Sequence, residues 1–340
     1  KKSIDLGRKE FVRLSKQGCE FLGVRHAVLG GAMSWLSERN LVAAISNSGA
    51  FGVIATGSMD PESLRNEIRG TFALTDKPFG VNVIIMHPEL DALLEVCIEE
   101  GIRYVVMAGG LPPKASTIRL NNCGIKVIAF APTLAITKKL ERQGVDAFII
   151  EGMEAGGHTG PVATSVLCQE ILPNIKDTPV FVGGGIGRGE SIALYMKMGA
   201  AGCQIGTRFV CAYESIAHQN FKRAFLSAKA RDAQLSIQLD AKFPVIPVRA
   251  LPNKATSEFV EAQRKAIAKY RAGELNQKEA QLIIEQFWAG SLRRAVLEGD
   301  IENGSLMAGQ SVGMVNSEQS VAEILAELVD QAVLAVAPLH

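Results

Sequence analysis

The chain has 340 residues, 47% of them hydrophobic and 21% charged, and its 36 basic and 35 acidic side chains leave a formal net charge of +1. This balance offers no basic surface for nucleic acid, and no apolar run reaches the ~18 residues that a membrane-spanning helix needs. The length suffices for one large domain, or for one large and one small domain.

The cysteines and the first residues indicate where the protein works. The 6 cysteines are scattered, without a C-x-x-C pair. This spacing is typical of buried, reduced thiols rather than of a metal site or a disulfide framework. The opening stretch KKSIDLGRKE is polar and has no signal-peptide core. We therefore expect a cytoplasmic protein without a bound metal.

Short apolar runs alternate with longer amphipathic stretches over the first two thirds of the chain. The apolar runs predict strands at residues 26–33, 51–56, 79–85, 104–110, 126–132, 146–152, 179–187 and 201–210. The stretches between them predict helices at residues 37–49, 60–75, 87–101, 114–124, 133–144, 165–175 and 188–199. Ser37 is expected to cap the first helix and Gly49 to end it, while Asp60 and Pro61 are expected to begin the second.

This repetition favours one α/β fold, the (β/α)8 TIM barrel. The expected strands are apolar throughout, as in a parallel sheet that is covered on both faces. The competing architecture is a doubly wound open sheet, whose dinucleotide fingerprint G-x-G-x-x-G opens a helix after an early strand. The stretch GGGIGRGE lacks that spacing and falls at the seventh strand, so we predict the barrel.

The alternation ends after residue 211. Residues 214–310 have a mostly helical pattern and are predicted to form a lobe, inserted after the eighth strand and lying over the active-site face. Within the lobe, KFPVIPVRALPNK (242–254) contains three prolines and predicts an irregular connector. The amphipathic stretch 317–337 predicts the eighth outer helix, so the barrel domain would comprise residues 1–213 and 311–340.

Glycines gather where five of the expected strands end, on the face that carries the active site of a barrel. They are Gly30 and Gly31, Gly109 and Gly110, Gly152, Gly156 and Gly157, Gly183, Gly184 and Gly185, and Gly206. Because glycine lets the backbone approach a ligand closely, the pattern predicts a large flat ligand across the barrel mouth. Tight turns without a ligand are the alternative.

The loops after the seventh and eighth strands are a common phosphate site in barrels. Gly184, Gly185, Gly206 and Thr207 would supply backbone donors and one hydroxyl there. A phosphate joined to a flat ring system predicts flavin mononucleotide (FMN).

Five stretches together resemble a known family. They are GGAMSWLSERNLVAAISNSGAFGVI, FGVNVII, EGMEAGGHTG, VFVGGGIGRGESIALYMKMGAAGCQIGTRFV and GSLMAGQSVGMV. In sequence and order they are similar to the nitronate monooxygenase (2-nitropropane dioxygenase) family, whose FMN-dependent barrels include enoyl-ACP reductases. The resemblance runs from about residue 20 to 335, and EGMEAGGHTG and GSLMAGQ are especially similar to the enoyl reductase branch.

The resemblance implies a set of cofactor contacts. The flavin ring would face the backbone near the end of the first strand, and an amide that both donates and accepts would lie at its pyrimidine edge. An acidic group would lie near the flavin chain, small residues would pack against the cofactor, and a glutamine would reach toward the phosphate. The ring would face Gly31, Ala32 and Met33, and the amide is that of Asn82. The acidic group is Glu151, the small residues are Ala155 and Gly156, and the glutamine is Gln204. An ordinary carboxylate at the strand end is the alternative for Glu151.

His158 matches the histidine of the family's A-G-G-H-x-G loop. The resemblance implies a catalytic role beside the flavin, where an imidazole with a pKa near neutrality can orient or deprotonate a substrate. The alternative is a histidine that only braces its loop. The other histidines, among them His26, His87 and His218, are expected to be structural or solvated.

Two activities follow from the resemblance. The first is FMN-dependent oxidation of alkyl nitronates by O₂, as in a nitronate monooxygenase. The second is NAD(P)H-dependent reduction of a 2-enoyl thioester. A lysine that some nitronate-oxidising members carry after the fifth strand is replaced here by Phe130 and Ala131, an apolar wall that suits a longer aliphatic substrate. A flavin-binding barrel without catalysis is a third reading, in which His158 would have no purpose.

The expected partner is a small-molecule substrate, and neither nucleic acid nor a membrane is expected. NAD(P)H as a co-substrate, an acyl carrier protein and a homodimer are left open at this stage.

Overall fold

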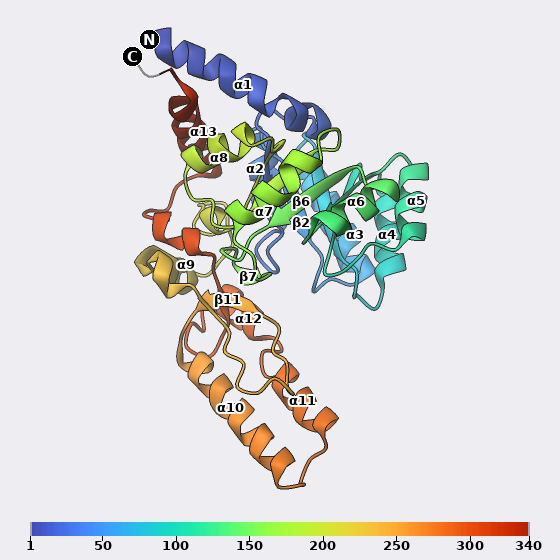
Figure 1. The fold of residues 1–340 in the computed structure, drawn as a ribbon, viewed down its shortest axis with the longest axis vertical. Helices are drawn as coiled ribbons and strands as arrows, with labels where there is room; N and C mark the ends of the chain where they lie inside the picture. Colours follow the sequence, from blue (N-terminus) through green and yellow to red (C-terminus); the bar gives the residue numbers. More distant parts are fainter. Residues whose placement is uncertain (1, 339–340) are drawn as a thin grey trace.

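The computed structural model describes residues 2–338, and eight parallel strands form a nearly closed barrel at its centre (Figure 1). The strands are hydrogen-bonded in the order β1-β9-β8-β6-β5-β4-β3-β2, and a parallel bridge between Leu29 and Phe51 joins β1 to β2. Their bounds are β1 (Val28–Gly30), β2 (Gly52–Ala55), β3 (Phe79–Ile84), β4 (Tyr104–Ala108), β5 (Lys126–Phe130), β6 (Ala147–Glu151), β8 (Val180–Gly183) and β9 (Gly202–Ile205). The predicted barrel and its eight strands are confirmed.

Helices follow the strands and surround them, as Figure 1 shows. They are α2 (Arg39–Asn47), α3 (Pro61–Leu74), α4 (Leu90–Glu99), α5 (Lys114–Asn122), α6 (Leu134–Arg142), α7 (Thr164–Ile171), α8 (Gly189–Lys197) and α13 (Val321–Val336). The last of them, α13, packs against both α8 and α2, so it closes the outer ring as expected. Asp60 caps α3 through Ser63 N, with Pro61 at the first helical position, as the sequence predicts.

The cap of α2 corrects one expectation. Glu38, not Ser37, is the cap, and its carboxylate accepts from the N–H groups of Asn40 and Leu41. Ser37 is engaged elsewhere, because its hydroxyl donates to Gly31 O and accepts from Met33 N.

An N-terminal helix that the sequence did not reveal, α1 (Lys2–Leu22), precedes the barrel. Its last turn reaches the barrel interior, where Leu22 is buried in one cluster with Leu29, Phe51 and Phe181. The Tyr104 hydroxyl, inside the same cluster, donates to Phe21 O at 2.6 Å. Apolar side chains therefore fill the barrel beneath the carboxyl ends of its strands, which is where the site lies.

The contact between α8 and α13 provides a test of the ring closure. A Cβ on Gly189 would lie 1.8 Å from Leu328 O and 2.6 Å from Ala332 N. We expect Gly189→Ala to lower the free energy of unfolding by about 1–3 kcal/mol or more, because backbone atoms cannot yield as a side chain does. Chemical denaturation measures this, with the exposed Leu194→Ala on α8 as a control that stays within about 0.5 kcal/mol. An unchanged Gly189→Ala would contradict the close helix contact.

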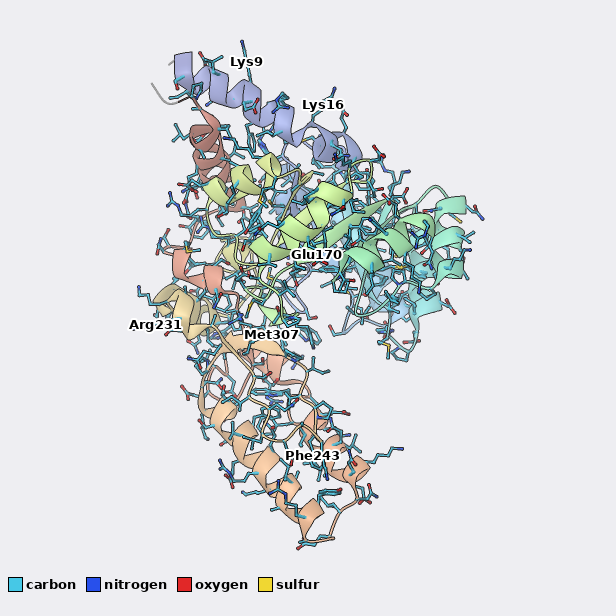
Figure 2. All side chains as sticks on the ribbon, viewed as in Figure 1. Lys9, Lys16, Glu170, Arg231, Phe243 and Met307 are labelled. Atoms are coloured by element: carbon cyan, nitrogen blue, oxygen red, sulfur yellow. The ribbon has the colours of Figure 1, made fainter. Side chains whose placement is uncertain are left out.

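The segment predicted as the lobe, residues 214–310, contains helices α9 (Gln219–Ser227), α10 (Lys254–Arg271), α11 (Gln277–Gln286) and α12 (Ser291–Arg293). Helices α10 and α11 extend away from the barrel in Figure 1, whereas α9 lies beside it, with Phe221 in one buried cluster with Leu36 and Val210. Phe243, Phe259 and Ile284 belong to a separate buried cluster that packs α10 and α11 together. Figure 2 shows Phe243 within the lobe and Met307 where the lobe meets the barrel.

A small antiparallel sheet lies at that junction and corrects the interpretation of residues 242–254. Those residues are not irregular throughout, because Val248–Leu251 form strand β11. This strand pairs with β10 (Gln234–Leu235), β12 (Leu306–Met307) and β7 (Gly157–His158). Strand β7 comes from the barrel loop that follows β6, so the sheet ties the lobe to the barrel.

Candidate active site

A cavity of about 470 Å³ opens at the carboxyl ends of the barrel strands. Every residue predicted from the sequence to bind the cofactor or to be catalytic lines it: Gly31, Ala32, Met33, Asn82, Glu151, Ala155, Gly156, His158, Gly184, Gly185, Gln204, Gly206 and Thr207. Asn82, Glu151 and Gln204 lie in strands β3, β6 and β9, and the others come from the loops after β1, β6, β8 and β9, which are far apart in the chain. Of the other strand-end glycines expected to face a flat ligand, Gly109 and Gly157 line the cavity, whereas Gly30, Gly110, Gly152 and Gly183 do not. The cavity has the position expected for a barrel active site.

The segment after β1 is held by hydrogen bonds that leave its backbone against the cavity. Gly31 N donates to Ile205 O at 2.8 Å, and the Ser37 hydroxyl donates to Gly31 O at 3.1 Å. The same hydroxyl accepts from Met33 N at 2.8 Å. Ser37 therefore fixes the path from Gly31 to Met33, a role that the capping signature in the sequence concealed.

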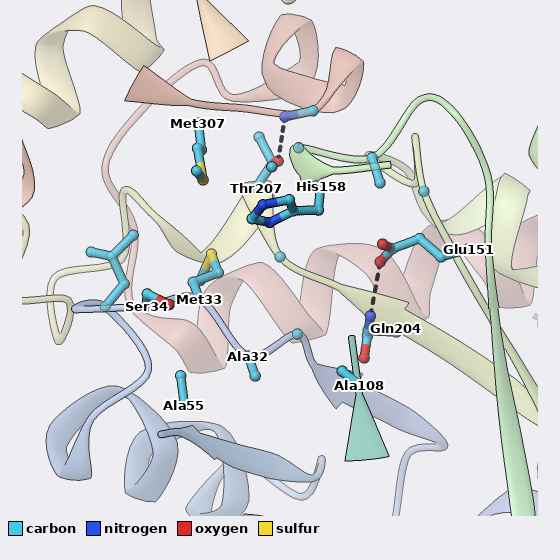
Figure 3. A pocket seen from close by; sticks show the side chains of 18 of the residues that line it. Ala32, Met33, Ser34, Ala55, Ala108, Glu151, His158, Gln204, Thr207 and Met307 are labelled. Atoms are coloured by element: carbon cyan, nitrogen blue, oxygen red, sulfur yellow. Dashed lines mark hydrogen bonds between the residues drawn. The ribbon is translucent and has the colours of Figure 1, made fainter. Parts of the chain in front are cut away.

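A carboxyl and an amide in the wall of the cavity are hydrogen-bonded to each other. Gln204 Nε2 donates to Glu151 Oε2 at 3.0 Å, as the dashed line in Figure 3 shows. Burial raises the pKa of Glu151 from 4.5 to about 7, although the hydrogen bond from Gln204 works against this rise. Nearby, Asn82 is 5% exposed and its amide has no hydrogen-bond partner among the described residues. These polar groups are available to a ligand.

The raised pKa of Glu151 predicts a pH-dependent stability for the cofactor-free protein. Below pH 4.5 the carboxyl is protonated whether the chain is folded or unfolded. Between pH 4.5 and about 7 the unfolded chain ionises first, so stability falls as the pH rises. The full loss, at most about 3 kcal/mol, is reached above the folded pKa. Glu151→Gln should therefore be more stable than the unaltered protein at pH 8 and nearly equal to it at pH 4.

Urea unfolding at the two pH values measures this effect. Glu190→Gln is the control, because its partner Arg188 lowers the pKa of Glu190 and removal of this carboxylate brings no gain at pH 8. Equal stabilities of Glu151→Gln and the unaltered protein at pH 8 would show that the carboxyl ionises without penalty.

Glycines form a cradle beside the ends of β8 and β9. Gly184 and Gly185 have φ values of +100° and +73°, which other residues rarely adopt. A Cβ on Gly184 would also lie 2.9 Å from Thr164 Oγ1. On the other side of the cradle, Thr207 Oγ1 accepts from Gly309 N at 3.0 Å (Figure 3). Such backbone can approach an anion closely.

His158 stands at the edge of this cavity. Its backbone pairs with Val248 across β7 and β11, while its imidazole has no hydrogen-bond partner among the described residues. Burial lowers the pKa of His158, which favours the neutral ring. A ring that is not engaged within its own loop is available to a substrate.

Arg249, next to Val248 on β11, steadies the loop that carries His158. It is 4% exposed, and its guanidinium donates to Met153 O at 2.9 Å and to Ala233 O at 2.6 Å. The buried arginine therefore joins the loop after β6 to the lobe, and the placement of His158 depends on both.

The structure adds cavity residues that sequence reasoning missed. Leu292, Met307 and Ser311 come from the chain beyond the eighth barrel strand, and Ser34 follows Met33. Figure 3 shows Met307, Met33 and His158 around the same space. The motif GSLMAGQSVGMV, which contains Met307 and Ser311, was the available signal, but it indicated a family and not a position.

A model of the family described as nitronate monooxygenase matches residues 16–331. The chain belongs to the nitronate monooxygenase family. It is an oxidoreductase of a family whose members are generally flavin-dependent and act on small molecules. The alternation of strands and helices and the site motifs are therefore features of one family fold.

Individual relatives differ in what they are named for. A (3aS,4S,5R,7aS)-5-hydroxy-7a-methyl-1-oxo-octahydro-1H-indene-4-carboxyl-CoA dehydrogenase of Rhodococcus jostii is 30% identical, over 92% of this chain and 94% of its own. A nitronate monooxygenase of Paraburkholderia phytofirmans is 27% identical, over 90% and 92%. Among solved structures, FabK from Thermotoga maritima is 36% identical with a TM-score of 0.82, covering 92% of this chain and 94% of that one. Family membership alone thus leaves the substrate open.

Among residues 2–338, none of the helices is long and apolar enough to cross a membrane, and no cluster of three or more His, Cys, Asp and Glu residues could hold a metal ion.

Proposed function

We propose that this protein is an FMN-dependent, NAD(P)H-consuming reductase of 2-enoyl thioesters. The observation that carries the proposal is the wall around His158, which is apolar and continues into the lobe through Leu292 and Met307. Phe130, at the end of β5, adds to the apolar lining. A wall of this kind suits an aliphatic acyl group better than a small nitronate anion. The relative named as a carboxyl-CoA dehydrogenase supports a thioester substrate.

The cavity residues fit FMN. The glycine cradle of Gly184, Gly185 and Gly206, with the Thr207 hydroxyl, would hold its phosphate. The unpartnered amide of Asn82 would meet the polar edge of its ring, and the backbone from Gly31 to Met33 would lie against the ring face. When bound, FMN supplies the electron transfer, and the protein supplies position and polarity.

His158 would act on the thioester. Because burial lowers its pKa, the neutral imidazole would donate an N–H to the thioester carbonyl and polarise the alkene. The overall reaction adds a hydride and a proton across the carbon–carbon double bond, with NAD(P)H as the reductant. The thioester carrier is coenzyme A or an acyl carrier protein.

Oxidation of alkyl nitronates by O₂ is the second candidate. It is favoured by the description of the family model and by the relative of that name. The donor at His158 would align the nitronate anion in the same cavity.

Anaerobic mixing of the flavin-loaded protein with each electron donor tests the two proposals. Rapid bleaching of the flavin by NADH or NADPH, followed by recovery on addition of a 2-enoyl thioester, is the expected result. Bleaching by propyl nitronate, with none by either nucleotide, would refute the reductase and support the second candidate.

A further inference from the structure

A second cavity, of about 390 Å³, lies inside the lobe and shares His158, Leu292 and Met307 with the first. We propose that this lobe cavity binds the aliphatic tail of the substrate, so that the protein selects long-chain over short-chain acyl thioesters. The inference rests on the proposed thioester reductase and names the part of the substrate that the lobe recognises.

The small sheet places the shared residues on one face. His158 lies opposite Val248, and Met307 lies opposite Ala250. Val248 and Ala250 are two positions apart on β11, so all four side chains belong to the same side of the sheet. Arg249, between them, turns to the other side, where it holds Met153 O and Ala233 O. One continuous surface therefore leads from the flavin site into the lobe.

The walls of the lobe cavity are mostly apolar. Phe259 and Val260 of α10 and Ile284 of α11 form the helical side, with Trp288 after α11. The ring of Trp288 packs against Phe259 with centroids 5.4 Å apart. The ionisable side chains in the lining are His158, at the shared end, and Glu285. A polar head near His158 and an apolar tail beyond it match this distribution.

The cavity is not a defect of packing at the centre of the lobe. Phe243, Phe259 and Ile284 belong to one buried apolar cluster, yet the space beside that cluster stays open. Ile237 and Ile246, which line the cavity, are 53% and 64% exposed. Unfilled apolar space and exposed isoleucines both cost stability, so their presence indicates a ligand that covers them.

Variants that fill part of the lobe cavity without replacing His158 test the proposal. Val260→Trp would project an indole from α10, and Ala250→Leu is an independent second variant from the sheet. Ala268→Leu, an exposed enlargement on α10 outside the cavity lining, is the matched control. The flavin-loaded proteins are compared in kcat/KM with crotonyl-CoA and trans-2-dodecenoyl-CoA, and in the affinity of the unreactive dodecanoyl-CoA by calorimetry.

The unaltered protein and Ala268→Leu should prefer the dodecenoyl substrate. Each cavity-filling variant should lose at least about tenfold of that preference, with a matching loss of dodecanoyl-CoA affinity, because each methylene kept from apolar burial loses about 0.8 kcal/mol. Equal preference in all four proteins would overturn the lobe cavity as the tail site while leaving the reductase standing.

The binding measurement separates the two proposals. Failure to reduce any thioester, with dodecanoyl-CoA binding that Val260→Trp abolishes, would refute the reductase and keep the lobe cavity as a site for an apolar tail. Absence of both turnover and binding in the unaltered protein would refute both.

Discussion

Replacement of His158 by alanine should lower kcat/KM for the thioester about a hundredfold to a thousandfold while FMN stays bound. The size of the loss is typical of removing one preorganised donor to a developing oxyanion. FMN should remain because Gly184, Gly185 and Gly206 lie on other loops, and the Glu151–Gln204 pair is held within strands β6 and β9. Steady-state kinetics and the flavin absorbance of the purified protein measure the two quantities.

Control variants distinguish a His158 that acts on the substrate from one that only stabilises its loop. His158→Gln keeps an N–H donor at this place and should recover part of the lost rate. His87→Ala removes a histidine from another barrel loop that does not line the cavity, and its kcat/KM should be unchanged. Full turnover by His158→Ala, or loss of FMN from both His158 variants alike, would show that the imidazole serves the loop and not the substrate.

The barrel could be predicted because its sequence pattern, a short apolar run followed by an amphipathic stretch, repeats along the chain. Each strand is a short apolar run such as FGVNVI, and some helices begin at a recognisable cap, as α3 does at Asp60 and Pro61. The missed elements lack such local signals. Strand β11 follows Pro247, and β7 is two residues of a glycine loop, so both exist because they pair with each other across about ninety residues of sequence. Helix α1 buries the small residues Gly7, Ser15 and Gly18 beside Phe11 and Leu22, so its buried side is not marked by large apolar residues alone.

The residues of the candidate site also fall into those that the sequence could predict and those that it could not. Glycines at strand ends could be located from sequence because a TIM barrel gathers those ends at one face. The contributions of the lobe could not, since the position of Leu292 and Met307 depends on how a separate sheet docks against the barrel. For Ser37 the prediction from sequence was wrong. Its place before a helix matched a cap, whereas its hydroxyl bonds to Gly31 O and Met33 N in a segment that lines the cavity.

Gly206→Ala should weaken FMN binding about tenfold or more without destabilising the cofactor-free fold. The new methyl would lie 3.6 Å from Met33 Sδ, an ordinary contact, and the φ of Gly206 is −116°, which alanine adopts freely. The fold therefore accepts the change. In the loaded protein the methyl would occupy space in the cradle that the phosphate needs to reach the backbone, since Gly206 lines the cavity between β9 and Thr207.

Gly160, a glycine in the loop after β7, supplies the matched control for this substitution. A Cβ on Gly160 would meet nothing within 4 Å, and Gly160 does not line the cavity, so Gly160→Ala should bind FMN as the unaltered protein does. Fluorescence titration of the cofactor-free proteins with FMN gives the affinities, and thermal unfolding of the same samples reports the fold. Equal FMN affinity for Gly206→Ala and Gly160→Ala would place the phosphate elsewhere in the barrel mouth, because a cradle that tolerates an added methyl is not holding an anion against its backbone.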